Sequence, residues 1–189
     1  MIIGLNGRLK SGKDTTYTIV KELHPNAERV SFAEKLKLSA AAVLDIDLDT
    51  LEWLKNRESL YYTIDGEKAF NMREFLQRYG TEGHRDIFGD DFWVDMALPL
   101  GIDHSDRLIV VTDMRFPNEI QRVKDLDGVC VKVERDTATM HGSHRSEQNV
   151  DHLMDYILDN TGTMDDLREG VAAMLSLIEN SFTNQRVGV

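Results

Sequence analysis

The sequence predicts an α/β fold in which an open, five-stranded parallel sheet is covered by helices on both faces, giving three layers. Two observations support this prediction. Short apolar segments alternate with amphipathic helical segments along most of the chain, which is the pattern of successive strand–helix–strand units. In addition, residues suited to binding phosphate or metal follow directly after four of the apolar segments. The carboxyl ends of parallel strands meet at one edge of such a sheet, and ligands bind at that edge.

Length and charge narrow the classes of function. A chain of 189 residues fits one domain with a substantial core. Its net charge of −11 argues against a nucleic-acid backbone or an anionic membrane as the main partner, because both require basic surface. A small anionic substrate is still compatible with this charge, since a local cluster of Arg and Lys can dominate inside a cleft. The single cysteine, Cys130, excludes an internal disulfide, and neither a signal peptide nor a membrane-spanning run is evident. We therefore expect a cytoplasmic protein.

The first strand, "MIIGLNG", leads into a helix, "KDTTYTIVKEL", through a glycine-containing loop. Within it, Gly7, Gly12 and Lys13 have the spacing G-x-x-x-x-G-K of a phosphate-binding loop. In such a loop the backbone N–H groups of residues 8 to 14 surround the phosphates, and the Lys13 ammonium bridges the outer ones. Lys10 adds a second positive charge to the loop or simply faces water.

The residue after this lysine is unusual. A Ser or Thr that binds magnesium is expected there, and this chain has Asp14. A carboxylate in the first turn of a helix is favoured by the helix dipole, which is one explanation. The other is that Asp14 lies near Mg²⁺, where an oxygen ligand is needed, with Thr15 as the alternative hydroxyl ligand. We favour Asp14 near the metal and Thr15 hydrogen-bonded to an inner phosphate.

A second strand, "AERVSFA", precedes a region that we expect to be mostly helical, over residues 33–100. Its helix "NMREFLQRYG" carries Arg73 and Gln77 four residues apart, so they share one face. An arginine can hold a phosphate with two donors, and a glutamine can read the edge of a base. Arg85 adds a further cation after this helix, and Lys35 either faces the same pocket or faces water. A solvated helix with scattered charges is the alternative interpretation.

The third strand, "RLIVVTD", ends at Asp113, and Arg115 follows two residues later. In phosphate-loop enzymes an acid in this place holds Mg²⁺ through water, although an aspartate that caps the next helix would look the same. Arg115 is suited to stabilise a transferring phosphoryl group, or it is an ordinary surface arginine. The helix "PNEIQRVKDLDG" comes next, with Pro117 at its start and Gly128 at its end.

The fourth strand, "VCVKVER", leads into a polar segment without periodicity, which we interpret as a lid loop over residues 135–150. Arg135 and Arg145 fit a lid that closes over phosphates. His141 and His144 stand three residues apart, but no other His or Cys supports a metal site there. A fifth strand, "DYILDN", and a long amphipathic helix, "MDDLREGVAAMLSLIENSF", complete the predicted fold.

Taken together, these motifs resemble the deoxynucleoside monophosphate kinases of tailed bacteriophages, a family of P-loop kinases in the nucleoside monophosphate kinase group. The matching pieces occur in the family's order: "GRLKSGKDTT", "REFLQRYGTE", "FWV", "VTDMRFPNE", "GVCVKVER", "HRSE" and "LDNTGTMDDL". The aspartate after the loop lysine is a feature of this family. The resemblance implies a single P-loop kinase domain over residues 1–189, with a helical monophosphate-binding region and a short lid. It also implies a bacteriophage source acting in the host cytoplasm, and it leaves a homodimer open.

The implied reaction is phosphoryl transfer from ATP to a deoxynucleoside 5′-monophosphate, with ATP and Mg²⁺ bound, giving ADP and the diphosphate. The residues and the resemblance together predict four groups of site residues. The catalytic group is Lys13, Arg115, Arg135 and Arg145, and the metal group is Asp14, Thr15 and Asp113. The ATP-binding group is Gly7, Lys10, Ser11, Gly12, Lys13, Asp14, Thr15, Asn160 and Gly162, the last two expected beside the adenine. The monophosphate-binding group is Lys35, Arg73, Gln77, Gly80, Thr81, Arg85 and Glu147.

Two other functions stay open at this point. One is a different small-molecule kinase with the same S-G-K-D loop, such as a phosphomevalonate or dephospho-coenzyme A kinase, against which the "REFLQRYGTE" stretch argues. The other is a nucleotide-binding module without catalysis, against which the intact Lys13, Asp113 and arginine set argues. The accepted bases and the selectivity for deoxyribose are not determined by the sequence.

Overall fold

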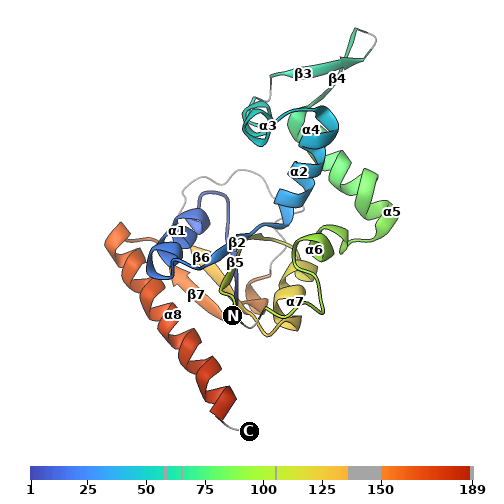
Figure 1. Cartoon of the computed structure of the whole chain (residues 1–189). Helices are drawn as coiled ribbons and strands as arrows, with labels where there is room; N and C mark the ends of the chain where they lie inside the picture. Colours follow the sequence, from blue (N-terminus) through green and yellow to red (C-terminus); the bar gives the residue numbers. More distant parts are fainter. Residues whose placement is uncertain (58, 65, 105, 136–149, 188–189) are drawn as a thin grey trace. The chain divides into compact units, whose positions relative to one another are not determined.

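Five parallel strands form the central sheet, in the order β2-β5-β1-β6-β7 (Figure 1). Their bounds are β1 Ile2–Asn6, β2 Glu28–Val30, β5 Ile109–Met114, β6 Val129–Glu134 and β7 Tyr156–Asp159. The predicted five-stranded parallel sheet is therefore confirmed. The computed structural model describes residues 1–57, 59–64, 66–104, 106–135 and 150–187. It comprises two compact units, the first made of Met1–Ser31 with Leu100–Val189 and the second of Phe32–Pro99.

Strand β1 occupies the centre of the sheet because its side chains are apolar on both faces. Its sequence, IIGLN, is buried over the first four residues, as expected for a strand that helices cover on both sides. Ile3 pairs with Val110 of β5 on one side and with Val129 of β6 on the other. At the carboxyl end, Asn6 pairs with Met114 and with Lys132, so the loop that follows β1 emerges between the ends of β5 and β6.

Helices cover both faces of this sheet. Helices α1 (Lys13–Leu23) and α8 (Met164–Val187) pack against each other and bury one face, with Leu5, Ile19 and Val171 in their shared core (Figure 1). Helix α7 (Pro117–Asp125) covers the other face, where a Cβ at Gly4 would meet the side chains of Met114 and Val123. This arrangement confirms the predicted three-layer α/β/α architecture.

The second unit, Phe32–Pro99, contains helices and a β-hairpin. Its elements are α2 Phe32–Leu44, α3 Leu48–Lys55, β3 Tyr61–Ile64, β4 Glu67–Asn71, α4 Met72–Gly80, the π-helix η1 Thr81–Arg85, α5 Asp86–Phe88 and α6 Phe92–Ala97. The sequence analysis expected helices here and missed the antiparallel pair of β3 and β4. The Asp-Gly dipeptide in "YYTIDGEKAFN", with aromatic and β-branched residues beside it, is the hairpin signal that could have shown it. Gly66 has φ +82°, which such a turn requires.

Local signals set the start of α4, the helix with the predicted substrate residues. The Asn71 side chain accepts from Glu74 N at 2.9 Å, and the Glu74 side chain accepts from Asn71 N at 2.9 Å, which forms a capping box. Leu51, Met72 and Leu76 form the buried core beneath this helix. Within the described part of the chain, no helix is long and apolar enough to cross a membrane.

Candidate functional site

The loop between β1 and α1 has the backbone geometry of an anion-binding turn. Gly7, Lys10 and Gly12 all have positive φ, at 151°, 64° and 105°. Gly12 is the N-cap of α1 and has no side chain that could cap the helix. The N–H groups in the first turn of α1 are therefore available to a ligand, and the dipole of this eleven-residue helix favours a negative charge there.

The side chain of Lys13 folds back onto this loop. Its Nζ donates to the carbonyl oxygens of Gly7 at 2.6 Å and of Arg8 at 2.9 Å. The pKa of Lys13 is lowered to about 8, mainly by burial and in addition by the positive charge of Arg115. The carboxylates of Asp14 and Asp113 act against this shift. The structure thus brings Lys13, Arg115, Asp14 and Asp113 within electrostatic reach of one another.

A buried hydroxyl points to a ligand in the loop. Ser11 is 2% exposed, and its Oγ has no hydrogen-bond partner among the residues that the structure describes. A buried hydroxyl that lacks a partner costs free energy, so such a group usually has a bound ion, water or ligand beside it. A Cβ on Gly7 would come within 2.5 Å of this Oγ, which leaves room only for glycine there.

Asn160 supports the loop from the carboxyl end of β7. Its side chain is buried, and Nδ2 donates to the carbonyl oxygen of Ser11 at 2.7 Å. A Cβ on Gly12 would lie 2.2 Å from the same Nδ2. The sequence resemblance placed Asn160 and Gly162 beside an adenine, and in the structure Asn160 contacts the loop backbone. Gly162 lies in the following turn, where a Cβ would meet Asp166 Oδ2 at 2.6 Å.

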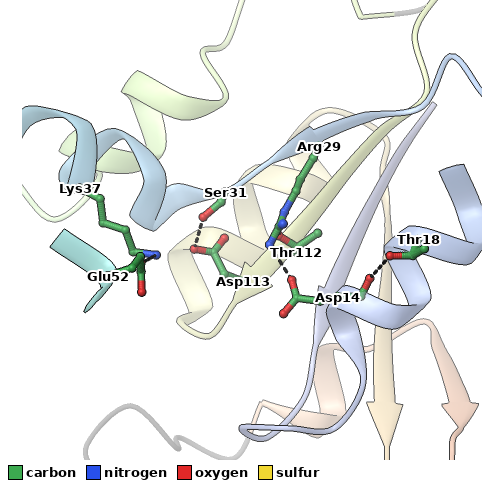
Figure 2. A network of polar contacts seen from close by, with 8 residues as sticks. All are labelled: Asp14, Thr18, Arg29, Ser31, Lys37, Glu52, Thr112 and Asp113. Carbon is green, nitrogen blue, oxygen red and sulfur yellow. Dashed lines mark hydrogen bonds and ion pairs between the residues drawn. The ribbon is translucent and has the colours of Figure 1, made fainter. Parts of the chain in front are cut away.

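The two predicted metal carboxylates of this unit each have a partner, one from β2 and one from the residue that follows it (Figure 2). Arg29 Nη2 lies 2.5 Å from Asp14 Oδ1, and Ser31 Oγ donates to Asp113 Oδ2 at 2.8 Å. Arg29 Nε also donates to Thr112 Oγ1 at 3.1 Å. Sequence reasoning missed Arg29 and Ser31. In the predicted strand "AERVSFA" they are two residues apart, which places both side chains on one face and was the available signal. In the structure β2 ends at Val30, one residue before Ser31.

The other predicted residues of this unit are distributed as follows. Thr15 follows Asp14 in the first turn of α1 and is half-buried, while Lys10 is exposed at the tip of the loop. The Arg115 side chain is exposed, and its backbone N donates to Glu119 Oε2 at 2.6 Å. Arg135 is exposed just beyond β6. Arg145, Glu147, His141 and His144, with most of the predicted lid, lie outside the described residues.

In the second unit, Gln77 lines a cavity. Ala69 and Phe70 of β4 and Glu74, Gln77 and Arg78 of α4 line this cavity, which is open to solvent and has a volume of about 340 Å³. An aromatic ring and several polar side chains around such a space suit a flat heterocycle with polar edges.

The remaining predicted residues of the second unit lie on α2, α4 and η1. Arg73 is exposed on α4, and Lys35 is exposed on α2. Gly80 ends α4, where a Cβ would meet Leu36 Cδ1 at 2.2 Å, and its carbonyl accepts from Trp93 Nε1 at 3.1 Å. Gly80 therefore has a packing role in this unit. Thr81 and Arg85 begin and end the π-helix η1, a conformation that is frequent at functional sites.

The chain is similar to one family of kinases and to several solved structures. A model of the family "Deoxynucleotide monophosphate kinase" matches residues 34–171. A candidate deoxynucleotide monophosphate kinase of Acanthamoeba polyphaga mimivirus is 23% identical over 193 residues, which cover 96% of this chain and 97% of the relative. Among solved structures, a dephospho-CoA kinase from Campylobacter jejuni has a TM-score of 0.47 at 15% identity, over 95% of this chain and 98% of the other. A shikimate kinase from Bacteroides thetaiotaomicron has a TM-score of 0.42 at 11% identity, over 95% and 98% of the two chains.

Proposed function

This chain belongs to the deoxynucleotide monophosphate kinase family, and from that premise we propose that it moves the γ-phosphoryl group of ATP onto a deoxynucleoside 5′-monophosphate, giving ADP and the diphosphate. The observation that carries the proposal is the loop between β1 and α1. It combines the N-terminus of α1, which no side chain caps, with the Lys13 ammonium and the buried hydroxyl of Ser11. The bacteriophage source and the host cytoplasm that the sequence resemblance implies stay predictions.

Hard oxygen ligands for Mg²⁺ are present beside this loop. Asp113 and Asp14 offer carboxylates and Thr15 offers a hydroxyl, which is the donor chemistry that magnesium prefers. Within the described ranges, no group of three or more His, Cys, Asp or Glu side chains is arranged to hold a metal. Mg²⁺ would therefore take most of its ligands from phosphates and water, as it commonly does in kinases. Bound there, it would neutralise phosphate charge.

The chain's own cations would stabilise the transferring group. Lys13 and Arg115 lie together at the sheet edge, and positive charge at that place stabilises the charge that spreads over the phosphoryl oxygens. Arg135 lies beyond β6 and Arg145 in the predicted lid, and we propose that both add to this charge when the lid closes and excludes water. A general base is unnecessary, because the acceptor phosphate is already an anion near neutral pH.

We propose that the acceptor binds to the second unit. Arg73 would hold the monophosphate with its two-pronged guanidinium, and the base would enter the cavity of about 340 Å³ beside Gln77. Phe70 offers that cavity an aromatic ring, and the Gln77 amide offers one donor and one acceptor for a base edge. Lys35, Gly80, Thr81, Arg85 and Glu147 complete the proposed acceptor set.

The test of this function is ADP release from Mg·ATP, coupled to NADH oxidation, in the presence of different acceptors. The acceptors are dAMP, dGMP, dCMP, dTMP, their ribose counterparts, phosphomevalonate and dephospho-CoA. A reaction without any acceptor serves as the blank. We expect turnover with one or more deoxynucleotides well above the blank. Turnover with only phosphomevalonate or dephospho-CoA would favour a different small-molecule kinase. ATP binding without turnover on any acceptor would favour a non-catalytic nucleotide-binding module.

Nucleotide affinity is expected to weaken as the pH rises above about 8, because burial and Arg115 lower the pKa of Lys13 to about 8. Below that pH the ammonium is charged and attracts phosphates; above it the neutral amine does not. Bound phosphates favour the charged form, so the Kd should rise roughly tenfold per pH unit above the pKa of the free protein. The measurement is a calorimetric ATP titration from about pH 6.5 to about pH 9.5, around that pKa. Lys13→Met is the control, and it should bind weakly with no such pH dependence. An unchanged Kd across this range in the wild type would contradict the assignment of Lys13.

A further inference from the structure

The acid that stands in place of the usual loop hydroxyl is paired with an arginine from the edge strand. Asp14 Oδ1 and Arg29 Nη2 are 2.5 Å apart, joining the first turn of α1 to β2 (Figure 2). Both side chains are open to solvent, at 80% for Asp14 and 48% for Arg29. Exposed ion pairs contribute little to folding stability, so stability alone is a weak reason for this pair.

Two further contacts fix the direction of the Arg29 guanidinium. Its Nε donates to Thr112 Oγ1 at 3.1 Å, and its Cζ lies 5.7 Å from the centre of the Tyr17 ring. Thr112 is buried in β5 and directly precedes Asp113. A planar guanidinium that is held at its Nε presents its two terminal nitrogens in a fixed direction, which a flexible ammonium does not. Arg29 is therefore oriented toward Asp14.

Asp14 creates an electrostatic problem for a loop that binds phosphates. Its carboxylate follows Lys13 directly, in the helix turn whose N–H groups face the ligand. The Asp14 carboxylate and a bound phosphate are both negative and repel each other, and this repulsion is larger near a protein surface than in bulk water. A loop with this acid and no counter-charge would bind a polyphosphate less tightly than a loop with Ser or Thr at the same place.

We propose that Arg29 is a positioning residue that compensates for Asp14. Its guanidinium neutralises the carboxylate and holds it in one direction, so that the loop accepts a polyphosphate despite carrying an acid. Ser31, which directly follows β2, donates a hydrogen bond to Asp113, so Arg29 in this strand and Ser31 after it hold both carboxylates. The inference goes beyond the proposed function and depends on it in one respect, namely that nucleotide phosphates occupy the loop.

The test is a double-mutant cycle in ATP affinity, measured by calorimetry in EDTA so that no metal contributes. Arg29→Ala should raise the Kd about tenfold, the size of one uncompensated like charge nearby. Asp14→Asn should bind metal-free ATP at least as tightly as the wild type, because it removes the repulsion. In the Arg29→Ala/Asp14→Asn double variant, the loss of ATP affinity caused by Arg29→Ala should disappear. Arg29→Lys, which keeps the charge and loses the fixed direction, should fall between wild type and Arg29→Ala.

The matched control is Arg107→Ala. Arg107 also forms an exposed ion pair with β2, through Glu28, with an Nε–Oε1 distance of 2.9 Å, and this pair does not include any residue of the loop. The Arg107→Ala variant should leave the ATP affinity unchanged. Thermal unfolding of each variant separates a binding defect from a folding defect, because neither exposed pair should shift the Tm appreciably.

Three outcomes would overturn the inference. Wild-type affinity in Arg29→Ala would show that Arg29 does not assist binding. A loss that persists in the Asp14→Asn background would show that Arg29 contacts the phosphates directly. Failure of the wild type to bind ATP at all would overturn the proposed function, and this inference with it. With Mg²⁺ present, the difference in ATP affinity between Arg29→Ala and the wild type should become smaller, because the cation neutralises the same Asp14 carboxylate.

Discussion

Replacing Lys13 with alanine is expected to abolish phosphoryl transfer, lowering kcat by more than about a hundredfold, the usual cost of removing a charge-stabilising group. In the structure Lys13 Nζ bridges two loop carbonyls, and its charge lies near Arg115 and both carboxylates. The substitution removes the cation that would stabilise the charge on the oxygens of the transferring phosphoryl group. It also removes the two hydrogen bonds from Lys13 Nζ to the loop carbonyls. The measurement is the coupled ADP-release assay with the best acceptor of the panel, together with the Kd for ATP.

Lys21→Ala is the control for this result. Lys21 lies in the last turn of the same helix, and its Nζ donates to the Ala27 carbonyl at 2.8 Å, away from the loop. It changes the net charge by the same amount and should retain activity. If Lys13→Ala kept near-normal turnover with an intact fold, the proposed role of the loop in phosphoryl transfer would be wrong.

Gly12→Ala is expected to weaken nucleotide binding on the order of a hundredfold, at the upper end of what backbone strain at a functional site costs. Gly12 has φ +105°, and the added Cβ would lie 2.2 Å from Asn160 Nδ2. The loop must then move away from Asn160 and lose the bond from Nδ2 to the Ser11 carbonyl. Calorimetric titration with ATP measures the effect directly.

Gly89→Ala provides a matched comparison. Gly89 has almost the same φ, +104°, with a ψ of 158° that only glycine adopts readily, and the added Cβ would meet nothing within 4 Å. Gly89→Ala should lower the Tm, because alanine is strained in this conformation, and should leave the ATP affinity unchanged. If both variants bound ATP equally well, contact between Gly12 and Asn160 would not be needed to hold the loop. A second variant, Asn160→Ala, should weaken ATP binding without introducing any strain at Gly12.

Much of the sheet was predictable because its signals are local. Apolar runs such as "RLIVVTD" and "VCVKVER" favour buried strands, and Pro117 marks the start of α7. The helix ends at Asp125, three residues before the predicted end at Gly128. The spacing of Gly7, Gly12 and Lys13 also lies within one short stretch. The hairpin of β3 and β4 was missed, although its Asp-Gly turn was local too, because the surrounding helical patterns dominated the interpretation.

The sequence by itself determined the parallel sheet, the phosphate-binding loop and the family to which the chain belongs, because these depend on neighbouring residues and on their order. Only the tertiary structure decided what surrounds the loop. The partners of Asp14, Asp113 and Ser11 are Arg29, Ser31 and Asn160, which lie 15, 82 and 149 residues away along the chain. No local pattern relates residues at such separations. They meet because the strand order β2-β5-β1-β6-β7 brings the carboxyl ends of distant strands to one edge, where charged and polar groups must find partners.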